Sequence, residues 1–179
     1  MSPQPILAFW FEELTDKQHF AKDAALDEAI RTRFGATLEA AARCELFAWR
    51  ATPEGRLAEI IVLDQFSRNV YRDTPRAFAQ DALALVLAQE LVASAQDGSL
   101  AVEHRIFAYM PYMHSESALV HTQAVAMFSQ PGMESNLDFE MRHKAIIDRF
   151  GRYPHRNAVL GRTSTAEELA ILSEPGSSF

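Results

Sequence analysis

The chain of 179 residues lacks several features that mark whole classes of protein. Cys44 is the only cysteine, which excludes an intramolecular disulfide and a cysteine-based zinc site. Seven glycines and eight prolines are too few for a collagen-like or low-complexity chain. The longest apolar runs, residues 6–11 and 82–88, fall far short of the roughly 20 residues that span a membrane, and no basic segment precedes the first run. We therefore expect a soluble, cytoplasmic protein with no membrane partner.

Common cofactor-binding and hydrolase motifs are also missing. The sequence contains neither the phosphate-binding loop ending in Gly-Lys-Ser/Thr nor the dinucleotide motif Gly-x-Gly-x-x-Gly, so no cofactor is predicted. It also lacks the Gly-x-Ser-x-Gly elbow of serine hydrolases. The net charge of −7 argues against a nucleic-acid partner, although one window, residues 141–162, carries six basic side chains and only one acidic side chain, Asp148.

What the sequence does contain is helical periodicity along nearly its whole length. Apolar residues recur at spacings of three and four, strand patterns are weak, and no linker or charged tract divides the chain. This pattern predicts an all-α fold of eight or nine helices, stacked as antiparallel hairpins in a single domain over residues 1–179.

Local signals predict where several helices begin. Thr52-Pro53 and Thr74-Pro75 each combine an N-cap residue with proline at the first helical position, and they predict helices to about residues 66 and 95. Asn136 is the predicted N-cap of a helix that ends at Gly151. Ser164 and Thr165, with Glu167 and Glu168 three residues later, supply a capping box for a last helix.

Other signals predict where helices are broken. Residues 23–49 read as two helices with a joint near Phe34–Gly35, because glycine weakens a helix interior. Pro111 is expected to interrupt the helix that starts near residue 100.

Two predicted helices end with the kernel Asp-x-Phe-x-Arg, at Asp64 and at Asp148. Asp64 shares a helix face with Leu57, Ile60 and Ile61, and Asp148 shares one with residues 137, 141 and 145. An isolated buried carboxylate is very costly, so we expect each of the two acids to be buried and paired with an arginine. Such pairs can be purely structural, or they can line a polar pocket.

Histidines lie near these charged segments. His114 and Glu116 occupy an aromatic-rich joint between helices, and His155 lies within the basic window. His114, Glu116 and His121 lack the His-x-x-x-His or Glu-x-x-His spacing of a metal site, so no metal is predicted. Either His114 or His155 is a candidate for acid–base chemistry.

Three segments give the sequence a family resemblance. They are residues 63–69 (LDQFSRN), residues 110–116 (MPYMHSE) and residues 152–157 (RYPHRN), the last followed by LGR at 160–162. With these motifs the chain resembles the mostly bacterial family known as "domain of unknown function 924". The resemblance implies a fold similar to that of tetratricopeptide-repeat proteins, and it brings no established activity. It also implies that these three segments are the signature positions of the family.

Two functions remain open on this basis. In the first, the chain has a binding or catalytic site for a small anionic ligand: Arg68, Arg152 and Arg156 hold the anion, while Asp64 and Asp148 orient the arginines. In the second, the stacked hairpins bind a peptide and the polar segments are scaffold, so enzymatic activity is left undecided, as is the oligomeric state. The candidate ligand-binding residues are Asp64, Arg68, Asn69, His114, Glu116, Asp148, Arg152, His155, Arg156 and Asn157.

Overall fold

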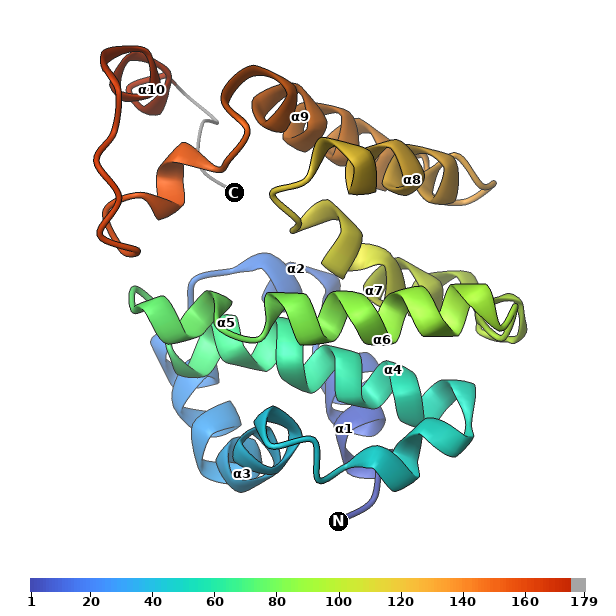
Figure 1. The fold of residues 1–179 in the computed structure, drawn as a ribbon. Helices are drawn as coiled ribbons and strands as arrows, with labels where there is room; N and C mark the ends of the chain where they lie inside the picture. Colours follow the sequence, from blue (N-terminus) through green and yellow to red (C-terminus); the bar gives the residue numbers. More distant parts are fainter. Residues whose placement is uncertain (175–179) are drawn as a thin grey trace.

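The computed structural model describes residues 1–174, and these residues form helices joined by short turns (Figure 1). The α-helices are α1 (Gln4–Ala8), α2 (Asp16–Phe20), α3 (Ala24–Ala42), α4 (Pro53–Ile61), α5 (Ser67–Val70), α6 (Asp81–Ala93), α7 (Val102–Met113), α8 (Ala118–Phe128), α9 (Glu134–Phe150) and α10 (Ala166–Leu172). One π turn follows α1 (Phe9–Glu13), and a second (Val62–Phe66) joins α4 to α5 without a break. The described part of the chain contains no strand, so the all-α prediction is confirmed.

The helix formed by α4, the π turn and α5 lies at the centre of the molecule. It contacts α3, α6 and α7, and every side chain from residue 57 to residue 67 is buried. Most of these side chains are apolar, as expected for an element that neighbouring helices cover on several sides, but Glu59, Asp64, Gln65 and Ser67 are buried among them. Asp64 lies inside this buried stretch.

Helices α6, α7, α8 and α9 stack in chain order and run in alternating directions (Figure 1). Consecutive helices with short connections pack as antiparallel neighbours, as the sequence predicted. After α9 the chain turns back, and a 3₁₀ turn (Pro154–Arg156) brings Arg156 against the first residue of α6. The segment that follows α9 therefore packs against the start of α6, in the middle of the chain.

The capping predictions hold at two helix starts. Thr52 Oγ1 accepts a hydrogen bond from the Gly55 N–H at 3.1 Å. Thr165 and Glu168 form the reciprocal capping box of α10. At Thr74-Pro75 the prediction is wrong in extent, because this signature opens only a 3₁₀ turn (Pro75–Phe78) and α6 starts at Asp81.

Two predicted breaks are absent from the structure. Helix α3 runs through Phe34–Gly35, because the buried rings of Phe34, Phe9 and Phe66 pack together and outweigh the modest cost of a helical glycine. Helix α7 continues through Pro111 to Met113. Pro111 is buried in the last turn of α7, and packing there compensates for the missing N–H. Helix α9 likewise begins at Glu134, before the predicted cap Asn136.

Candidate functional site

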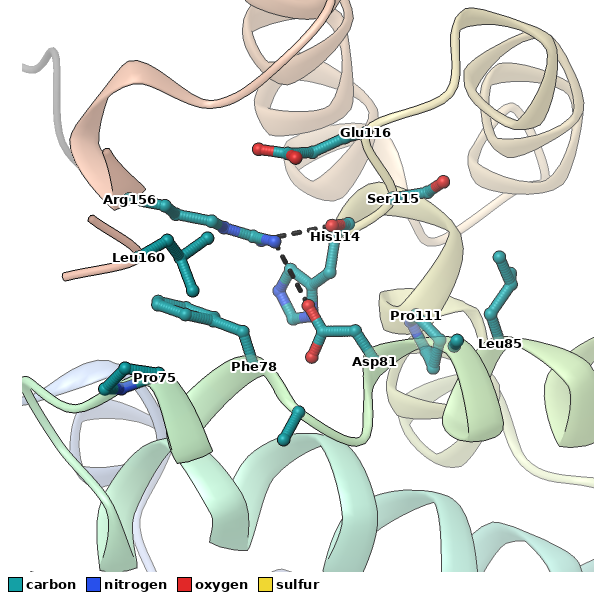
Figure 2. Close-up of a pocket in the computed structure, with 12 residues that line it drawn as sticks. Pro75, Phe78, Asp81, Leu85, Pro111, His114, Ser115, Glu116, Arg156 and Leu160 are labelled. Atoms are coloured by element: carbon teal, nitrogen blue, oxygen red, sulfur yellow. Dashed lines mark hydrogen bonds and ion pairs between the residues drawn. The ribbon is translucent and has the colours of Figure 1, made fainter. Parts of the chain in front are cut away.

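A cavity of about 390 Å³ lies where the start of α6, the end of α7 and the C-terminal segment meet (Figure 2). Its polar lining includes Asp81, His114, Glu116 and Arg156, and its apolar lining includes Phe78. Residues from two of the three signature segments therefore lie on one cavity wall. The third signature segment, which carries Asp64, lies directly behind His114.

The pair formed by Asp64 and His114 is the centre of the site. His114 follows the last residue of α7, and Asp64 lies in the π turn of the central helix. The Nδ1 atom of His114 is 2.7 Å from Asp64 Oδ1, and the Gln65 amide donates to the other carboxylate oxygen at 2.6 Å. Turns of π-helix occur often at functional sites, because they redirect side chains out of the regular helical register.

The electrostatics of this pair fix its protonation state. Burial alone raises the pKa of Asp64, but the charge of Arg68 and the bond to His114 outweigh it and hold that pKa well below its usual range. Burial and the Arg68 charge both lower the pKa of His114. An ionised Asp64 beside a neutral His114 requires that Nδ1–H donates to the carboxylate. The Nε2 atom of His114 then carries the free lone pair.

Asp81 forms ion pairs with two arginines, Arg68 and Arg156. The sequence analysis did not identify this residue as part of the site. Arg68 donates to its two oxygens at 2.8 and 3.0 Å, and Arg156 donates to Oδ2 at 3.1 Å. Arg68 also contacts Asp64 Oδ1 at 2.9 Å, so its planar fork lies between two carboxylates. The available signal was position: Asp81 is the acid directly before the apolar run 82–88.

Arg156 is the cationic side chain on the cavity wall, and it is 6% exposed. Its guanidinium lies over the rings of Phe78 and Tyr153, at 4.6 and 4.5 Å from their centroids. It donates to the backbone oxygen of His114 at 3.0 Å (Figure 2). Its Nε has no hydrogen-bond partner among the described residues. Burial and the nearby Arg68 charge lower the pKa of Arg156.

Glu116 fastens the C-terminal segment to the end of α7. Arg162 donates to both of its oxygens at 2.7 and 2.9 Å, and the backbone N–H of Tyr153 donates at 2.7 Å. Arg162 Nε also donates to Asn157 Oδ1 at 2.9 Å, and Asn157 Nδ2 donates to Ser164 Oγ. Glu116 lines the cavity, whereas Asn157 serves the fold of the segment.

The prediction for Asp148 is wrong. Its side chain is 47% exposed and forms an ion pair with Lys144 at 2.6 Å, with no arginine involved. The buried face of α9 carries Glu140, His143, Ile146 and Ile147, so the face that Asp148 shares with residues 141 and 145 points outward. Asp148 does share a helix face with residues 141 and 145, but that face is exposed to solvent and not buried.

Three further candidates lie away from the cavity. Arg152 forms an ion pair with Glu168 at 2.6 Å. Asn69 donates to Asp27 at 2.7 Å in a separate cluster between α3 and α5. His155 packs near the Tyr153 ring, outside the cavity lining, and burial together with the Arg156 charge lowers its pKa to about 4.

A second acid–histidine pair lies buried beside the site. His121 Nδ1 is 2.7 Å from Glu140 Oε1, and both side chains are fully buried. His121 Nε2 lies 2.9 Å from the backbone oxygen of Ser115. Within residues 1–174 no group of three or more His, Cys, Asp or Glu side chains is placed to hold a metal ion. His114, Glu116 and His121 therefore form no such group.

Comparison with known proteins identifies the family. The family described as "Bacterial protein of unknown function (DUF924)" matches residues 6–176. The chain belongs to the DUF924 family. A solved structure of a protein of unknown function from Agrobacterium tumefaciens is 36% identical to it, covers 96% of each chain and superposes with a TM-score of 0.91. No curated protein matches the sequence.

The family match confirms the resemblance seen in the three signature segments. The structural likeness supports the helical DUF924 fold over nearly the entire chain. No helix in the described part of this family member has the length and apolar character needed to cross a membrane.

Proposed function

We propose that the cavity at the end of α7 binds a small molecule with a carboxylate or phosphate group, and that His114 transfers a proton to or from it. The observation that carries this proposal is that His114, which lines the cavity, is held from behind by the buried carboxylate of Asp64. A carboxylate that holds one ring nitrogen leaves the other nitrogen poised to exchange a proton.

The chemistry assigned to His114 follows from its tautomer. With Nδ1–H bonded to Asp64, Nε2 is a base, and the lowered pKa keeps it unprotonated at neutral pH. When Nε2 takes a proton, the negative charge of Asp64 stabilises the imidazolium that forms. The cavity lining includes no cysteine or lysine, and Ser115 Oγ already accepts a bond from the Ser117 N–H. We therefore assign His114 to proton transfer with substrate or water.

Arg156 is assigned to the anionic group of the ligand. It lines the cavity, and its fixed position over two aromatic rings leaves it little orientational freedom to lose on binding. Arg68 has a different role, because it is not part of the cavity lining and both of its terminal nitrogens contact Asp81. It positions Asp81 and keeps Asp64 ionised.

We also place the protein in a reducing compartment such as the cytoplasm. Its single cysteine, Cys44, is exposed, and an exposed thiol persists best where thiols are kept reduced.

A thermal-shift screen of the whole chain against carboxylates and phosphates tests the binding step, because a ligand that binds only the native state raises the melting temperature. Arg156→Met keeps apolar bulk and removes the charge, so the shift should disappear in that variant. Arg152→Met is the matched control: it alters an arginine of the same segment that pairs with Glu168, and the shift should remain.

The proton-transfer step has its own measurement. The ¹⁵N chemical shifts of His114 should show an unprotonated Nε2 at neutral pH, and that signal should move when a stabilising anion is added. If no anion stabilises the parent, and Arg68→Met and Arg156→Met both unfold, the polar cluster is scaffold and the proposal is wrong.

A further inference from the structure

A second cavity, separate from the one that contains His114, lies between the N-terminal helices and the first turns of α7. Its volume is about 550 Å³, within the range that accommodates small molecules. Its lining comes from α1, α2 and the stretch between them, from α7, and from the start of α9.

Aromatic rings form much of the wall of this second cavity. The rings of Phe11 and His104 stack with centroids 4.0 Å apart. Phe107 contacts the edge of Phe11 at 5.6 Å and lies nearly parallel to Phe20 at 6.3 Å. Phe20 is 66% exposed, so its ring is accessible from solvent at the edge of the cavity.

The charge around the rings has one sign. Glu12, Asp16 and Glu103 line the cavity, and no lysine or arginine does. The ion pairs formed across residues 1–174 use other carboxylates, so these acids are left without a salt-bridge partner. Carboxylates and aromatic rings that line the same cavity attract an organic cation, since ring faces also carry negative charge.

We propose that this second cavity binds a small organic cation, an ammonium group on an apolar body. The ammonium group lies between the rings and the carboxylates, and the apolar body contacts Leu7 and Ile106, which also line the cavity. The aromatic wall distinguishes this cavity from an ordinary solvated acidic surface. This site is independent of the proposed function at His114, because the two cavities share no lining residue.

The test uses three probes of the same shape in an NMR titration of the full chain. Choline carries the positive charge. Neohexyl alcohol (3,3-dimethylbutan-1-ol) has carbon in place of the choline nitrogen and is neutral, and 3,3-dimethylbutanoate carries a negative charge. We expect saturable binding of choline with shifts at His104 and Phe107, and binding of neohexyl alcohol that is weaker by about fivefold or more. The anion 3,3-dimethylbutanoate should not bind.

Two variants separate the aromatic contribution from the charge. Phe20→Leu should weaken choline binding by about two- to fivefold, because leucine keeps apolar bulk and lacks a ring face. Phe47→Leu is its control, since Phe47 is equally exposed at 69% and lies outside the cavity lining. Glu103→Gln should also weaken binding, whereas Glu90→Gln, an exposed acid on α6, should not.

The proposal is overturned if neohexyl alcohol binds as tightly as choline, if the anion binds better, or if none of the probes saturates at millimolar concentration. Binding of a lysine-rich peptide without binding of choline also overturns it, because the occupant is then a protein segment. An equal loss of choline affinity in Phe20→Leu and Phe47→Leu also overturns it, because the ring of Phe20 then contributes nothing specific to binding.

Discussion

Asp64 is the buried carboxylate that interacts with both Arg68 and His114 in the candidate site. It is 1% exposed, and a single oxygen, Oδ1, contacts both Arg68 and His114. The Asp64 carboxylate therefore neutralises the Arg68 guanidinium and also fixes the tautomer of His114. Removing it affects two partners that have little access to water.

We expect Asp64→Ala to lower the free energy of unfolding by about 3–5 kcal/mol, because it removes one partner of a buried ion pair. Asp148→Ala is the natural control. Asp148 belongs to the same Asp-x-Phe-x-Arg kernel but forms an exposed pair with Lys144, so its loss should cost about 0.5 kcal/mol or less. Urea denaturation of both variants measures the difference, and similar values would contradict the burial of Asp64.

These two aspartates also show what the sequence could predict about the site. Helical spacing correctly placed Asp64 on a buried face, because Leu57, Ile60 and Ile61 on the same face are apolar and buried. The same spacing failed for Asp148, because α9 has apolar residues on both faces: Met141 is 50% exposed while Ile147 is buried. Which face points inward depends on α7 and α8, against which α9 packs, and sequence spacing carries no information about that.

At the scale of helices, the ends of elements were predictable where a side chain makes a local bond. The Thr52 cap and the capping box of Thr165 and Glu168 are contacts within one turn, so the local sequence is sufficient to specify them. The π turn at Val62–Phe66 was not predictable. It shifts the hydrogen-bond register of a buried helix, and we attribute it to packing and to the Asp64 bonds with distant residues.

The caps give a prediction for the central helix. Thr52→Ala removes the bond to the Gly55 N–H at the start of α4 and should lower the free energy of unfolding by about 1 kcal/mol. Ser117 precedes α8 without making a side-chain cap bond, so Ser117→Ala should change stability by only a few tenths of a kcal/mol. Thermal and urea unfolding compare the two, and an equal loss would mean that the Thr52 bond contributes nothing.

For the whole molecule, buried histidines make stability depend on pH. Burial lowers the pKa of His143 to about 3, and burial with the Arg156 charge lowers that of His155 to about 4. Because these values lie below the unfolded value of 6.5, the unfolded chain takes up protons first as the pH falls. Each histidine then removes up to about 1.4 kcal/mol per pH unit, starting near pH 6.5 and continuing to its folded pKa.

Carboxylates extend the loss to lower pH. The bonds from Arg152 and from the Thr165 N–H lower the pKa of Glu168 to about 2, so its stabilisation disappears as the pH falls from the unfolded value of 4.5. Glu140 opposes this trend, because burial raises its pKa. The free energy of unfolding, measured by urea from neutral pH to pH 4, should decrease steadily. His143→Gln should flatten that slope, and an unchanged slope would show that His143 is not responsible.

The attachment of the C-terminal segment has one more consequence. Within residues 151–174, the buried Tyr153 donates its hydroxyl to the backbone oxygen of Met113 and packs against Ile147. The segment is also attached by two partly buried ion pairs, Arg156 with Asp81 and Arg162 with Glu116. Such contacts weaken at high ionic strength more than apolar packing does. Amide hydrogen exchange in residues 153–172 should therefore accelerate in concentrated salt while α4 stays protected. Because Arg156 and Leu160 line the first cavity, each such opening event also uncovers His114.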